Sequence, residues 1–89
     1  MPYYFAQISI SPSVERKIRT KHGISTKDLR MALIFGSHFT TKWDFNNPDG
    51  ASLVVVAYLA NGRKFMAHLL PVDESEGIWI LKTAYHLHK

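Results

Sequence analysis

Hydrophobic residues alternate with polar ones in some stretches of the chain and recur at helical spacing in others. Alternation across Tyr3–Ile10 predicts a first strand. Val14 and Ile18 are one helical turn apart, and Leu29 and Leu33 repeat that spacing further along the chain. The pattern therefore predicts one strand followed by two helices.

Capping residues set the limits of the two helices. Ser11 before a proline is a favourable start, which predicts a first helix over Pro12–His22. Gly23 suits a left-handed C-terminal cap. Ser25, three residues before an aspartate, begins a capping box, so a second helix is expected over Thr26–Phe35, ending at the glycine that follows.

Strand and turn signals fill the rest of the chain. Turn formers at Asn46–Gly50 predict one hairpin connection, and Asn61-Gly62 predicts a two-residue type I′ turn. One segment, 52–60, is apolar on both alternate faces, which is typical of a central strand covered on both sides. The predicted strands are Ser37–Phe45, Ser52–Ala60, Arg63–Leu70 and Ile78–Tyr85.

These elements predict an α+β fold of order β-α-α-β-β-β-β, with two N-terminal helices packed on an antiparallel sheet. At 89 residues the chain is expected to form a single domain over residues 1–89. It has no cysteine, which excludes a disulfide framework and favours a reducing cytoplasm. The longest apolar run, Leu53–Ala60, is too short to cross a bilayer, so no membrane association is expected.

The net charge of +4 favours an anionic partner, although such an excess can also serve solubility alone. If alternation continues along the last two strands, Lys64 and His68 share one side of their strand, Lys82 and His86 share one side of the next, and one face of the sheet would carry all four. Lysines neutralise phosphate oxygens and histidine transfers protons near neutral pH, so these four predict a phosphate cradle. The alternative is that the lysines lie at solvated strand ends and His68 is an interior residue.

Other chemistry finds little support in the sequence. No Gly-x-Ser-x-Gly elbow, phosphate-binding glycine loop, cysteine nucleophile or HExxH spacing is present, so no metal or cofactor is expected. Trp43 and Trp79 are of a type that stacks on unpaired bases, but Trp79 is more typical of a core residue. His22 ends the first helix, where an imidazole also serves as a cap.

The junction Lys21-His22-Gly23-Ile24-Ser25 between two helices, the strand meander and the ending Trp79–His86 resemble the RelE/ParE superfamily of bacterial toxins, especially its BrnT-like branch. Members resembling RelE are ribonucleases that cleave messenger RNA, free or on the ribosome, without a metal and with the 2′-hydroxyl as nucleophile. ParE-like members share the fold and act on gyrase. The resemblance also implies a cognate antitoxin as partner.

The resemblance assigns roles to particular residues of this sequence. Arg63 and Lys64 would hold the phosphate or stabilise its transition-state charge, and His86 or Tyr85 would transfer protons. The next candidates are His68 for catalysis and Lys82 for binding, with Lys21 and His22 completing the expected RNA-binding set.

We therefore expect the toxin of a toxin–antitoxin pair that acts as a metal-independent ribonuclease on mRNA. The alternative is a non-catalytic protein-binding module or a gyrase-directed toxin of the same fold. A third reading is a nucleic-acid-binding domain without activity, whose affinity would depend steeply on salt.

Overall fold

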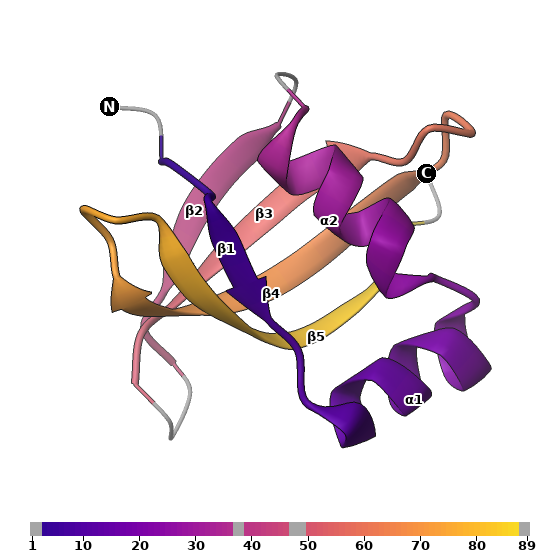
Figure 1. Ribbon diagram of the computed structural model, residues 1–89, viewed down its shortest axis with the longest axis horizontal. Helices are drawn as coiled ribbons and strands as arrows, with labels where there is room; N and C mark the ends of the chain where they lie inside the picture. The colour runs from indigo at the N-terminus through magenta and orange to yellow at the C-terminus, as the bar shows by residue number, and fades with distance from the viewer. Residues whose placement is uncertain (1–2, 37–38, 47–49, 88–89) are drawn as a thin grey trace.

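A computed structural model describes residues 3–36, 39–46 and 50–87. Two helices lie on one side of a five-stranded sheet of order β1-β5-β4-β3-β2 (Figure 1). β1 runs parallel to β5, and the other neighbouring strands are antiparallel. The predicted α+β order is confirmed. The elements are β1 (Gln7–Ser9), α1 (Pro12–His22), α2 (Thr26–Ile34), β2 (Thr40–Asp44), β3 (Ser52–Tyr58), β4 (Lys64–Asp73) and β5 (Ile78–His86).

The capping signals of the two helices are confirmed. Ser11 Oγ accepts a hydrogen bond from the Val14 amide at 3.3 Å, and Ser25 Oγ accepts one from the Asp28 amide at 3.1 Å. Gly23 ends α1 with a φ of 66°, a left-handed conformation in which a side chain would be strained. α2 is one residue shorter than predicted, because Phe35 forms its C-cap in place of the glycine.

The hydrophobic core lies between the helices and the sheet. Each strand contributes the alternate residues that face the helices, and both helices contribute one apolar stripe. The largest fully buried side chain is that of Trp79, which confirms it as a core residue. Around it pack Ile18, Ile24, Leu29, Leu33, Leu53, Val55, Phe65, Leu69 and Leu81.

The first strand is shorter than predicted. β1 covers only three residues of the expected Tyr3–Ile10. The segment before it is held by side-chain packing and not by a continuous ladder of backbone hydrogen bonds to a neighbouring strand. The ring of Tyr3 packs edge to face on that of Trp79, with the ring centroids 6.2 Å apart, and Phe5 is buried. Two amides, those of Ala6 and the first residue of β1, donate to the carbonyl of Gly77 at 2.8 and 3.0 Å.

The β3–β4 connection is longer than the predicted type I′ turn. Such a turn needs positive φ at both Asn61 and Gly62, and only Gly62 has it, at 87°. The amide of Gly62 donates to the carbonyl of Leu59, and the first cross-strand pair is Tyr58 with Lys64. The other predicted turn includes residues 47–49, which lie outside the described residues, as do residues 37 and 38 of the predicted second strand.

Candidate functional site

The sheet has an open face, defined here as the side of β2–β5 that points away from both helices (Figure 1). Residues paired across neighbouring antiparallel strands lie on the same face, so the register shows which side chains share it. Its central side chains are partly exposed. Two rows cross the open face: Thr40, Val56, Met66 and Tyr85, and beside them Lys42, Val54, His68 and Thr83.

A β-bulge at Lys82 decides which residues of β5 reach the open face. His68 pairs with Thr83 and Leu69 pairs with Leu81, so Lys82 is an extra residue between two registers. An extra residue reverses the alternation of everything that follows it in the strand. Tyr85 therefore comes to the open face and His86, paired with the buried Phe65, faces the helices.

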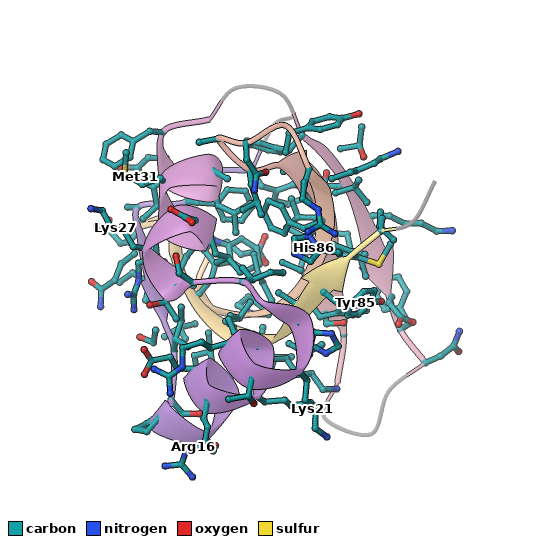
Figure 2. The ribbon with its side chains drawn as sticks, turned by 90° about the vertical axis from the view of Figure 1, so that its right-hand side faces the viewer. Arg16, Lys21, Lys27, Met31, Tyr85 and His86 are labelled. Carbon is teal, nitrogen blue, oxygen red and sulfur yellow. The ribbon has the colours of Figure 1, made fainter. Side chains whose placement is uncertain are left out.

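The predicted face that joined Lys64, His68, Lys82 and His86 is therefore wrong. Lys64 and His68 do share a face of β4, as predicted, but His86 lies on the other side of the sheet, with a buried Nδ1. Figure 2 shows the side chains of Tyr85 and His86 on opposite sides of β5. Of the two proton-transfer candidates at the end of this strand, only Tyr85 joins His68.

His68 and Tyr85 are held together by a hydrogen bond. Nε2 of His68 lies 3.0 Å from the hydroxyl of Tyr85, and the same hydroxyl donates to Sδ of Met66 at 3.1 Å. When the hydroxyl of Tyr85 gives its proton to Sδ of Met66, the tautomer that can donate to this hydroxyl is the one with Nε2–H, and Nδ1 of the neutral imidazole then keeps its lone pair. The pair can therefore orient a neutral imidazole as a proton acceptor.

The surroundings of His68 favour this neutral form. Burial lowers the pKa of His68 below its usual value, the carboxylate of Asp44 raises it, and the ammonium of Lys82 lowers it. The net direction is downward from 6.5, so the imidazole is mostly neutral at pH 7. A neutral imidazole at that pH is the form that a general base requires.

Two substitutions should move the pKa of His68 in opposite directions. Lys82→Met removes a nearby cation, so the pKa should rise, and Asp44→Asn removes a nearby anion, so it should fall. An NMR titration that follows the imidazole resonances of His68 measures both changes. Shifts of the same sign in the two variants would contradict this account of the charges around His68.

His22 reaches the same site from α1. Its ring lies 6.0 Å from the ring of Tyr85, and the ring of His68 lies 5.8 Å from that of Tyr85. The phenol is thus in contact with two imidazoles, one from a helix end and one from the sheet. Lys21, the residue before His22, is exposed on the same turn of the helix.

The other predicted RNA-binding residues lie away from this cluster. Lys64 is exposed at the start of β4, four residues before His68, which is about 13 Å along a strand. Arg63 is exposed in the connection before β4, where its amide donates to the side chain of Asn61. The structure therefore brings together His68, Tyr85, His22 and Lys82, and separates Lys64, Arg63 and His86 from them.

A cleft of about 450 Å³ opens beside His68, within the size range of ligand sites. It is lined by Lys42, Trp43, Asp44, Phe45, Asn46, Val54, Met66 and His68. Sequence reasoning missed Lys42 and Asp44 as site residues. The signal was available, because neighbours of Trp43 in a strand must face away from the core if Trp43 packs toward it.

The described residues form no metal centre and no helix that could span a membrane. No group of three or more histidine, cysteine or carboxylate side chains among residues 3–36, 39–46 and 50–87 is arranged to hold a metal ion. In the same ranges, neither helix has the length and apolar character needed to cross a bilayer.

No family model, curated protein or solved structure matches the chain. The side chains of the open face, together with the resemblance of the sequence, are therefore the grounds for a functional proposal.

Proposed function

We propose that this chain is a metal-independent endoribonuclease with a RelE/ParE-like fold and the toxin of a toxin–antitoxin pair. The observation that carries the proposal is that Tyr85, on the open face of the sheet, contacts two imidazoles, that of His68 on the same face and that of His22 at the end of α1. Two groups that accept and donate protons, set on either side of a phosphate, are what RNA cleavage without a metal requires.

The reaction assigns one proton transfer to each imidazole. Nδ1 of His68 takes the proton of a ribose 2′-hydroxyl while its oxygen attacks the adjacent phosphorus. The bond from phosphorus to the 5′-oxygen breaks, and the ring of His22 gives a proton to that leaving oxygen. The products are a 2′,3′-cyclic phosphate and a 5′-hydroxyl, so no oxidant, metal or cofactor is needed.

Charge around the open face suits a polyanionic substrate. Lys42 lines the cleft, and Lys82 is near enough to His68 to lower the pKa of its imidazole. An ammonium there offsets the negative charge that builds up on the phosphate oxygens in the transition state. The net charge of +4 adds a general attraction for RNA.

The toxin–antitoxin assignment depends on the resemblance of the junction Lys21–Ser25 and of the ending Trp79–His86 to RelE/ParE toxins. It carries with it a cognate antitoxin as protein partner and mRNA, free or on the ribosome, as substrate. A toxin with these targets works in the cytoplasm, which agrees with a chain that contains no cysteine.

Cleavage of single-stranded RNA of mixed sequence in EDTA tests the proposal. Tyr85→Phe should reduce kcat by about tenfold, because His68 loses the hydroxyl that orients its ring. Mass spectrometry of the products should find 2′,3′-cyclic phosphate ends.

Tyr58→Phe is the matched control, since Tyr58 is exposed on the same face near the far end of β3 and should change kcat by less than about twofold. Intact RNA after incubation with the wild-type protein, free or with ribosomes, would reject the nuclease.

One observation favours a protein-binding function as the second candidate. Val54, Val56 and Met66 are apolar residues on a face that neither described helix covers, and a partner protein could bury them. A gyrase-directed toxin would use the face in this way. Inducing the protein in bacteria separates the two functions, because early arrest of translation favours the nuclease and an SOS response favours gyrase.

A further inference from the structure

The exposed side of α1 is strongly basic. Four of the eleven lysines and arginines of the chain lie on this eleven-residue helix, and all four are exposed. The only acid of α1 is Glu15, in its first turn. We call these four cations, Arg16, Lys17, Arg19 and Lys21, the α1 basic face.

The α1 basic face is exposed along the helix and leads to the candidate site. At 100° per residue Arg16 lies about 160° around the helix from the fully buried Ile18, Lys17 and Arg19 lie about 100° to either side, and Lys21 lies about 60° from it. Lys21 precedes His22, whose ring contacts Tyr85. Arg16 lies five residues further from the site, about 7.5 Å along the helix axis. Figure 2 shows Lys21 and Arg16 on this helix, with Tyr85 near the end that carries Lys21.

The composition of this surface fits a nucleic acid better than a protein. The centres of protein interfaces are rich in aromatic and apolar residues and poor in lysine. The exposed positions of α1 hold no aromatic or large aliphatic residue, since its partly buried Val14 and buried Ile18 face the core. Interfaces with nucleic acids are polar and positively charged, and arginine and lysine bind phosphate oxygens directly.

We propose that the α1 basic face is a phosphate-binding track for the part of an RNA strand that flanks the cleavage site. The proposal extends the proposed function, on which it rests for the position of the cleaved phosphate beside His68 and Tyr85. From there the strand passes His22 and Lys21 and continues along α1, where successive phosphates meet Lys17 and Arg16. A track of this kind raises the affinity for long RNA and leaves the chemical step unchanged.

Binding of two RNA probes that resist cleavage tests the track. The probes are a single-stranded 12-mer and a 4-mer, both with 2′-O-methyl riboses, so that no 2′-hydroxyl can attack. Each phosphate contact contributes about 0.7 to the slope of log K against log salt for single strands. The triple variant Arg16→Gln, Lys17→Gln, Lys21→Gln should therefore lower the slope for the 12-mer by about 2 and weaken its binding about tenfold or more near physiological salt.

Three comparisons make the test specific. Binding of the 4-mer, which has only three phosphates and therefore meets fewer of these cations at once than the 12-mer, should weaken clearly less than binding of the 12-mer in the triple variant. Lys17→Gln should weaken binding of the 12-mer more than Lys27→Gln, because Lys27 is also an exposed helix lysine but lies on α2, outside the α1 basic face. Glutamine is nearly as good a helix former as lysine, so melting temperatures should stay close to that of the wild type.

Several results would overturn the track. These are an unchanged salt slope in the triple variant, an equal loss for the 4-mer, and an equal loss in Lys27→Gln. Poly-L-glutamate serves as an acidic polypeptide probe. If the triple variant lost binding of poly-L-glutamate but kept binding of RNA, the α1 basic face would belong to an acidic protein.

The proposal of a phosphate-binding track on α1 and the proposal of nuclease activity can be rejected independently. If the 12-mer shows the expected slopes while unmodified RNA stays intact, the track stands and the nuclease is rejected. If unmodified RNA is cleaved and the triple variant keeps the wild-type KM for long substrates, the nuclease stands and the track is rejected.

Discussion

His68→Gln is expected to lower kcat for RNA cleavage by about 10²- to 10⁴-fold, the usual contribution of a general base. Glutamine can still donate a hydrogen bond to the hydroxyl of Tyr85, so the local packing should persist. It has no ring nitrogen that can take the proton of the 2′-hydroxyl. KM should change little, because the imidazole is neutral at pH 7 and is not one of the cations that hold phosphate.

His86→Gln is the matched control. It distinguishes the site seen in the structure, which excludes His86, from the site that alternation along the sequence predicts, which includes it. His86 faces the helices from the other side of the sheet, so kcat should stay within about threefold of the wild type. Thermal melting should show that both variants are folded at the assay temperature. A large loss of kcat in His86→Gln together with a small one in His68→Gln would contradict the assignment of the base.

His68 should also determine how kcat/KM depends on pH in acidic solution. Because the pKa of His68 lies below 6.5, the neutral imidazole persists into mildly acidic solution and is lost only at lower pH. kcat/KM should therefore rise with pH through a value below 6.5. A rise centred well above 6.5 would assign the base to a different group.

Local chemistry in the sequence accounts for the helices and the central hairpin strands. Serine N-caps and a left-handed glycine act within a few residues, so Ser11, Gly23 and Ser25 determine the same helix limits in the sequence and in the structure. The alternation that places Lys64 and His68 on one face of β4 is also local. For this reason it survives although the predicted turn before it is wrong.

The site could be predicted only in part, because it depends on a feature of strand pairing. A bulge becomes visible only when β5 is paired with β4, and nothing in the residues around Lys82 marks it. When alternation is continued through Lys82 without a bulge, it predicts His86 beside His68 and Tyr85 on the opposite face. In the structure Tyr85 is beside His68 and His86 is on the opposite face. Alternation around Trp43 is enough to turn Lys42 and Asp44 away from the core, but only the pairing of β2 with β3 and of β3 with β4 shows that this face also carries His68.

Gly77→Ala is expected to destabilise the fold by about 2–5 kcal/mol, by two separate effects. Gly77 has a φ of 71°, where a side chain costs about 1–2 kcal/mol. An added Cβ would also lie 2.8 Å from the backbone nitrogen of Ala6 and 2.6 Å from the ring of Tyr4. The ring can move, but the nitrogen of Ala6 is held by its hydrogen bond to the carbonyl of Gly77 itself. Overpacking of this kind adds about 1–3 kcal/mol.

Gly23→Ala isolates the first of these effects. Gly23 has a φ of 66°, and a Cβ built there meets no atom within 4 Å. Gly23→Ala should therefore lose only the backbone strain of about 1–2 kcal/mol from its free energy of unfolding. Urea denaturation of both variants measures the difference, and equal losses would contradict the clash at Ala6.

Gly77 immediately precedes β5, whereas Tyr85 is near the other end of that strand. At a temperature where Gly77→Ala remains folded, it should therefore cleave RNA with the wild-type kcat. The strain that the added Cβ introduces lies at the β1–β5 junction and not among His68, Tyr85 and His22.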